Sequence, residues 1–167
     1  MLLGAACSAE PPPPPIGPVR SEATQQGVAL RLESPRSVVR AEDAIDVITS
    51  VVNERAEPQT LFSSSSGPVA FGITRLEDGL TAELDWEDDC APHELAPGEP
   101  VDYPFQKSGS WSEEDPDADF MREYAADPDL HLPPGRWRIE ARLHGVLGEC
   151  GGPPVMLSTT IEVTVTK

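Results

Sequence analysis

From Gly27 onward, apolar and polar residues alternate with a period of two along much of the chain. The clearest stretch is 136–144, where the apolar residues from Trp137 to Leu143 are separated by charged residues. The same pattern recurs, wholly or in part, in residues 28–33, 44–52, 69–75 and 155–165. Such alternation predicts strands with one apolar and one polar face, which is typical of antiparallel sheets.

Turn-forming residues separate these stretches. Proline, glycine, serine and asparagine cluster at residues 34–35, 53–58, 63–68, 77–79, 97–98, 133–135 and 151–154. Several short strands joined by such turns favour an all-β protein, and we predict an Ig-like antiparallel β-sandwich over residues 27–167.

One segment of the predicted sandwich lacks the alternation. Residues 111–129 contain eight acidic residues and one basic residue around Phe120, Met121 and Tyr124. We interpret this segment as an acidic loop inserted between strands, with at most a short helical turn. Because its carboxylates repel one another, we expect it to be mobile and to resist docking on the sheet.

Residues 8–26 form a different kind of segment, with almost no periodic apolar content. The five consecutive prolines Pro11–Pro15 favour a short polyproline II rod, and the remainder is polar and flexible. We predict a disordered, proline-rich linker that holds the domain away from a surface.

Residues 1–7 resemble the end of a bacterial lipoprotein signal. Leu2 and Leu3 are followed by small residues and then by Cys7, as at the lipobox, where the cysteine is acylated and becomes the new N-terminus. Gly4 stands where a lipobox usually has leucine, and there is no basic segment before it, so we expect the true start to lie upstream. The resemblance implies an exported, lipid-anchored protein of the cell envelope. The alternative is an accidental leucine- and alanine-rich tail.

Charge excludes some partners. With 12 basic and 29 acidic residues in 167, the net charge is −17, which repels phosphate backbones and anionic lipid headgroups. We therefore expect no nucleic-acid binding. No later apolar run approaches the ~18 residues of a membrane span, so membrane association would depend on Cys7. A domain of this size buries enough surface to fold alone, and we expect a monomer.

The chain has three cysteines. If Cys7 carries a lipid, Cys90 and Cys150 remain as a pair, and outside the cytoplasm such a pair usually oxidises. We predict a disulfide between them. The alternatives are two buried free thiols or two metal ligands. A zinc site needs about four ligands, often in close pairs, and the chain has no Cys-x-x-Cys spacing.

Alternating carboxylates suggest one candidate metal site. Asp115, Asp117 and Asp119 could turn toward one Ca²⁺ ion, which accepts six to eight oxygen ligands. The segment does not match an EF-hand, because Phe120 stands where glycine is needed and Ala126 where a bidentate glutamate belongs. We expect no cofactor and at most weak Ca²⁺ binding, since a solvated acidic loop explains the same residues.

Catalytic residue types are present without a recognisable arrangement. Serines gather at Ser63–Ser66 and histidines stand at His93, His131 and His144, but no serine lies in a Gly-x-Ser-x-Gly elbow. These residues keep a hydrolase with an unrecognised site as one hypothesis. Arg136, Arg138 and Arg142 share the polar face of one strand. They either pair with acids across the sheet or form a positive patch for a partner's carboxylate.

Several motifs resemble the intracellular proteinase inhibitor (BsuPI) domain. They are Val51-Val52-Asn53, residues 58–62 and 69–75, Asp78-Gly79, residues 95–99 and residues 132–137. The resemblance implies an Ig-like fold over about 28–165 and an inhibitor that presents an exposed loop to its enzyme. The acidic insertion and the cysteine pair depart from the family pattern.

The favoured hypothesis is a non-catalytic, lipid-anchored envelope protein that binds or scaffolds another component. Its partner would be an unknown protein or other envelope component. A BsuPI-type inhibitor is the first alternative and a hydrolase the second.

Overall fold

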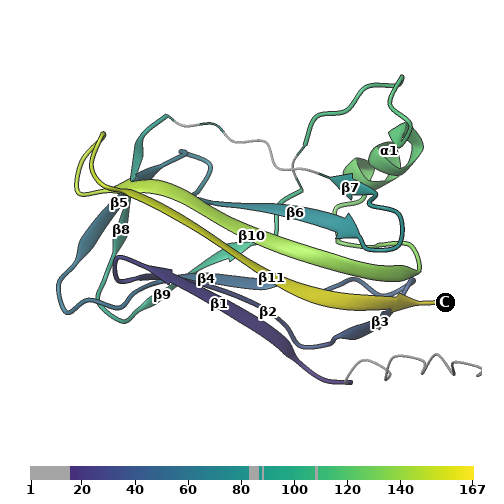
Figure 1. Cartoon of the computed structure of the whole chain (residues 1–167), viewed down its shortest axis with the longest axis horizontal. Coiled ribbons are helices and arrows are strands. Elements are labelled where there is room, and N and C mark those ends of the chain that lie inside the picture. Colours follow the sequence, from purple (N-terminus) through teal and green to yellow (C-terminus); the bar gives the residue numbers. More distant parts are fainter. Residues whose placement is uncertain (1–15, 83–86, 88, 108) are drawn as a thin grey trace, which may run out of the picture.

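The computed structural model describes residues 16–82, 87, 89–107 and 109–167. Within them it has two β-sheets packed as a sandwich and one short helix, which confirms the all-β, Ig-like prediction (Figure 1). The strands are β1 (Val19–Gln25), β2 (Val28–Ser34), β3 (Val38–Arg40), β4 (Ile48–Asn53), β5 (Gln59–Ser63), β6 (Val69–Arg75), β7 (Thr81–Ala82), β8 (Ala91–Leu95), β9 (Pro100–Pro104), β10 (Gly135–Leu147) and β11 (Pro154–Thr166), and the helix is α1 (Ala118–Ala126).

The first sheet has the strand order β1-β2-β4-β9 and the second β3-β11-β10-β5-β8. The pairings are antiparallel except that of β3 with β11. Strand β10 has 13 residues and pairs with two strands along one edge, with β6 through Trp137–Leu143 and with β5 at Val146 and Leu147. The β10–β11 hairpin is thus the longest pairing of the sandwich and fixes the places of β5 and β6.

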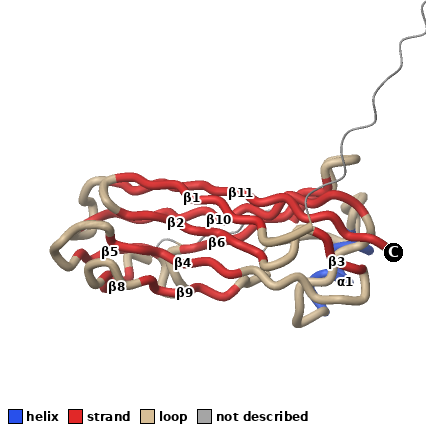
Figure 2. Tube along the Cα trace, turned by 90° about the horizontal axis from the view of Figure 1, so that it is seen from below, coloured by secondary structure: helices blue, strands red, loops and turns tan. Residues whose placement is uncertain are grey.

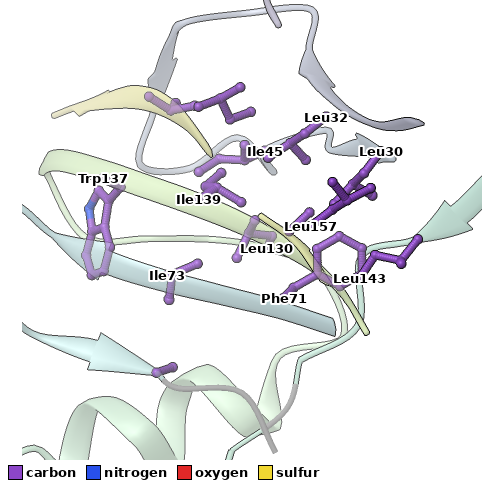
Figure 3. Packing of buried hydrophobic residues seen from close by; sticks show 14 of the residues in the cluster. Leu30, Leu32, Ile45, Phe71, Ile73, Leu130, Trp137, Ile139, Leu143 and Leu157 are labelled. Carbon is purple, nitrogen blue, oxygen red and sulfur yellow. The ribbon is translucent and has the colours of Figure 1, made fainter. Parts of the chain in front are cut away.

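The core lies between the sheets, where the sequence pattern places it. Trp137, Ile139, Ala141 and Leu143 are buried on the inner face of β10, each at most 1% exposed. Figure 3 shows Leu30 and Leu32 of β2 on one side of Ile139, and Phe71 and Ile73 of β6 on the other. Burial of such side chains is the main favourable contribution to folding.

The predicted linker was too long, because residues 19–25 are strand β1. Gln26 and Gly27 connect β1 to β2 with φ of 53° and 77°, as in a two-residue type I′ hairpin turn. Backbone pairing and side-chain amides hold β1: Gln25 accepts from the backbone N–H of Met156 at 2.8 Å. Since β1 buries little apolar surface, it shows no hydrophobic periodicity. Residues 8–15 lie outside the described residues.

The expectation that the acidic segment would resist docking was also wrong. Residues 118–126 form α1, and Ala118, Met121 and Tyr124 on one face of the helix are buried. Figures 1 and 2 show α1 at the same end of the sandwich as β3 and the C-terminus, away from the β10–β11 turn. The i, i+3 spacing of the three residues gives the helix an apolar face, which outweighs the repulsion between carboxylates that point into solvent.

The predicted disulfide is confirmed. Cys90, just before β8, is bonded to Cys150 in the turn between β10 and β11, with 6.1 Å between the Cα atoms. The bond ties two loops at the end of the sandwich opposite α1 (Figure 1). In the part of the chain that the structure describes, no helix is long and apolar enough to cross a membrane.

Candidate functional site: a groove beside helix α1

Lys107 fixes the C-terminal end of α1. Its Nζ donates to the backbone carbonyls of Tyr124 and Asp127, both at 2.8 Å, and lies 4.6 Å from the centre of the Tyr124 ring. Carbonyls at a helix C-terminus lack helical partners, so a cation there supplies both hydrogen bonds and favourable charge. Partial burial removes water from the ammonium group and lowers the pKa of Lys107, although Asp127 and Asp129 oppose this effect.

Aromatic side chains attach α1 to the sandwich. The ring of Phe120 lies between those of Tyr124 and Trp137, with centroid distances of 5.7 and 5.8 Å. Trp137 is fully buried, and its Nε1 donates to the carbonyl of Pro133 at 2.9 Å. Burial also raises the pKa of the Tyr124 hydroxyl. Helix α1 therefore docks through stacked rings anchored in β10.

A half-open groove of about 230 Å³ lies beside this aromatic stack. Its walls come from three separate segments: Ala41 after β3, Phe120 and Glu123 of α1, and residues 131–133 before β10. Tyr124 and Asp127 complete the lining. Docking of α1 thus creates the groove, since the helix supplies one entire side.

The polar side chains of the groove include two carboxylates, an imidazole and the Tyr124 hydroxyl. His131 Nδ1 donates to Asp127 Oδ2 at 2.8 Å. An ionised carboxylate only accepts, so Nδ1 of His131 carries a proton. Glu123 has no side-chain hydrogen bond or ion pair within the described ranges.

Asp127 is held in its ionised form. The backbone N–H of Asp129 donates to Asp127 Oδ1 at 2.8 Å, and this bond, followed by the one from His131, lowers the pKa of the Asp127 carboxyl. The groove therefore presents two carboxylates and an imidazole against apolar walls. Among the described residues, its lining has no serine, threonine, cysteine or lysine. This arrangement suits recognition of a hydrogen-bond donor or a cation.

The serines and the other histidines meet at the opposite end of the sandwich. His93 Nε2 lies 2.8 Å from the backbone carbonyl of Ser64, whose hydroxyl is instead bonded to that of Ser66 at 2.7 Å. Ser63 Oγ donates to the carbonyl of His144 at 2.5 Å. A nucleophile needs its base within hydrogen-bond reach of its hydroxyl, and these contacts run through backbone carbonyls. These hydrogen bonds stabilise the conformation of the turn between β5 and β6.

The arginines of β10 pair with acids, but only Arg138 does so across the sheet, as the first alternative predicts. Arg138 lies 3.7 Å from Glu162, its register partner on β11, and Arg136 lies 3.5 Å from Glu77. Arg142 binds Glu140 through two hydrogen bonds of 2.8 Å. The outer face of β10 is therefore close to neutral and does not form a positive patch.

The three aspartates of the candidate Ca²⁺ site have separate surroundings. Asp115 accepts from the backbone N–H of Ser112 at 2.7 Å, Asp119 binds Arg122 at 2.7 Å, and Asp117 precedes α1. The described residues hold no group of three His, Cys, Asp or Glu side chains arranged to bind a metal ion. Cys7, the expected lipidation site, lies outside the described residues.

Sequence reasoning missed the residues that form the groove. Asp127 and His131 are four residues apart, a spacing that could have suggested a contact. Lys107 gave no signal, because its role depends on the position of α1. Ala41 and Pro133 are brought to the groove by the fold alone.

Comparison with known proteins adds little to this picture. No protein-family model matches the chain, and no curated protein matches it. One similar solved structure is that of a Bordetella pertussis protein provisionally described as ApaA. It shares 12% identity over 92% of this chain and 94% of its own, with a TM-score of 0.40. A likeness this weak supports no inference about function.

Proposed function

We propose that the protein is a non-catalytic binding module of the cell envelope, anchored by a lipid on Cys7, that holds a partner in the groove beside α1. The observation that carries the proposal is the groove itself. It combines apolar walls with the carboxylate of Glu123, which has no partner among the described residues, and its lining contains no serine, threonine, cysteine or lysine nucleophile. Few convergent polar groups against apolar walls are typical of binding sites.

The Cys90–Cys150 disulfide supports the envelope location. Such bonds form and persist mainly in oxidising compartments outside the cytoplasm. The proline-rich segment and Cys7 are consistent with a module tethered at a membrane surface. Fractionation of cells tests the anchor: wild-type protein is expected in the membrane fraction, and a Cys7→Ser variant in the soluble fraction. Retention of the variant on membranes in high salt would place the anchor elsewhere.

Affinity capture tests the binding activity. The full chain, immobilised and oxidised, is expected to retain a component of envelope extract that, once purified, rebinds with one-to-one saturation. A reduced, unfolded sample of the same chain is the control. If no component rebinds after purification, or if the purified chain hydrolyses envelope substrates, the proposal is wrong.

A second candidate function, proteinase inhibition, is favoured by one observation. The exposed turn between β10 and β11 is braced by the disulfide at Cys150, and the side-chain amide of Gln26 donates to the carbonyl of Pro154 at 2.7 Å. A rigid, exposed loop suits binding to a proteinase, because little ordering entropy is lost. Inhibition assays against a panel of proteinases, with a Cys90→Ala/Cys150→Ala variant for comparison, test this function.

A further inference from the structure

We infer that the occupant of the groove is a lysine or arginine side chain of a partner protein. This inference rests on the proposed function and names the chemistry of its partner. The first argument is size. A volume of about 230 Å³ is below the roughly 300–1,000 Å³ of typical small-molecule sites, so the groove fits one long side chain better than a whole ligand.

The lining of the groove matches a cationic side chain along its length. Ala41, Leu132 and Pro133 offer apolar contact for an aliphatic stem. The carboxylates of Glu123 and Asp127 offer acceptors for the charged head. Lysine and arginine bury their stems against apolar surface while the charged group meets polar partners. An anionic ligand would meet the two carboxylates of Glu123 and Asp127, which would repel it.

The basic residues of the neighbourhood do not fill this role. Lys107 donates to two backbone carbonyls at the end of α1. Arg122 is bonded to Glu113 and Asp119, and its guanidinium lies 5.6 Å from the Trp111 ring centre. Glu123 is thus left for an external cation. The net charge of −17 would also steer a basic partner toward the molecule.

The aromatic stack argues against a quaternary ammonium ligand such as a choline headgroup. Such ligands are held against the open faces of aromatic rings. Here Phe120 is stacked between Tyr124 and Trp137, and Lys107 lies against Tyr124. A cation in the groove meets the carboxylates of Glu123 and Asp127, which suits a hydrogen-bonding ammonium or guanidinium group.

The test is an NMR titration of the full, oxidised chain with three blocked glycine-rich peptides. One contains a single lysine, one a single arginine, and one a single norleucine as an uncharged control. The lysine or arginine peptide is expected to shift the backbone amides of Ala41, Glu123 and His131 in a saturable manner, and the norleucine peptide is not.

Three variants distinguish binding in the groove from general electrostatic attraction. Glu123→Gln is expected to weaken binding of the basic peptide about three- to fivefold, as loss of an exposed ion pair does. Glu114→Gln removes the same charge from the same acidic segment outside the groove and is expected to change binding less than about twofold. Ala41→Leu fills the groove without changing charge and is expected to abolish the specific shifts.

Shifts spread evenly over the acidic surface, or equal effects of Glu123→Gln and Glu114→Gln, would overturn the inference. An envelope partner that binds the Ala41→Leu and Glu123→Gln chains as tightly as wild type would also overturn it, and would leave the binding function standing on another surface. Absence of any envelope partner, by contrast, contradicts the proposed function itself.

Discussion

The side chain of Asn53 donates a hydrogen bond to the backbone carbonyl of Leu95 at 3.1 Å and so joins the two sheets of the sandwich. Asn53 ends β4 and is fully buried. Its amide also donates to the carbonyl of Glu57, while Oδ1 accepts from the backbone N–H of Arg55 and from Gln59. All the hydrogen-bonding atoms of this side chain are therefore engaged.

Replacement of Asn53 is expected to destabilise the sandwich strongly. In Asn53→Ala, the buried carbonyl of Leu95 loses its side-chain donor and the turn after β4 loses two further bonds. We expect the free energy of unfolding to fall by about 2–4 kcal/mol, because an unsatisfied buried polar group costs about 1–3 kcal/mol. Urea denaturation measures the change. Thr60→Ala, which removes only an exposed bond to Glu94, is the control and should cost less than about 1 kcal/mol. Equal costs in the two variants would refute this role of Asn53.

Loss of the disulfide is expected to lower the free energy of unfolding, because the unfolded chain gains conformational entropy without the cross-link. Cys90 and Cys150 are 60 residues apart, and a cross-link over a loop of this length contributes about 4 kcal/mol in the chain-entropy model. The oxidised protein should therefore unfold at clearly higher guanidinium concentration than the Cys90→Ala/Cys150→Ala variant. Cys7→Ser is the matched control and should keep the wild-type midpoint. Coincident unfolding curves for the oxidised protein and the double variant would contradict the prediction.

Lys107→Met is expected to loosen α1 while leaving the strands intact. The variant removes two hydrogen bonds to carbonyls at the helix C-terminus and the charge that complements them, at a cost of about 1–2 kcal/mol. Hydrogen exchange should accelerate in residues 118–127 and remain slow in β10. Lys167→Met, at the exposed C-terminal residue, is the control. Unchanged exchange in α1 would show that the aromatic stack alone fixes the helix.

The ion pair of Arg75 and Asp78 is expected to be visible in an acid titration. Arg75 donates to both carboxylate oxygens, at 2.9 and 2.6 Å, and these bonds lower the pKa of Asp78 to about 2. Because the folded-state pKa lies below the unfolded value, the stabilisation is complete above about pH 4 and is lost as pH falls toward 2. NMR of the Asp78 carboxyl carbon measures this pKa.

Two arginine variants control that titration. Arg75→Gln should return the pKa of Asp78 toward its ordinary value, while Arg40→Gln, whose ion pairs are with Glu42 and Asp43, should leave it near 2. If the Asp78 pKa is the same in the wild type and in Arg75→Gln, the ion pair is not formed in solution.

Strands of the sandwich could be predicted where the alternation of apolar and polar residues reflects which side chains are buried. Trp137 to Leu143 alternate because every second residue meets the core, so the pattern alone identifies β10. Strand β1 was not predictable in this way, since it is held mainly by backbone pairing and by side-chain amides such as that of Gln25. Only the Gln26-Gly27 turn signals it, because glycine readily adopts the positive φ that the second turn position requires.

The groove was harder to predict than the fold. Its acidic residues suggested a repelling, mobile loop, whereas the apolar spacing of Ala118, Met121 and Tyr124 indicated a docked helix. Ala41, Phe120 and His131 are far apart in the sequence and meet only because α1 packs against the end of β10. No local pattern encodes that contact. The disulfide, in contrast, could be predicted from the number of cysteines, because Cys90 and Cys150 remain as a pair once Cys7 is assigned to the lipid.

Site-specific photo-crosslinking in intact cells tests most directly whether the protein binds a partner through the groove. A photoreactive residue at Pro133, which lines the groove, is compared with one at Thr160, exposed on β11. Because a side chain seated in the groove would lie against residue 133, we predict one discrete protein adduct at this position and none at Thr160. The adduct should disappear when Glu123→Gln and Ala41→Leu are combined in the same chain. An adduct at Thr160 alone, or no adduct at Pro133, would contradict the account.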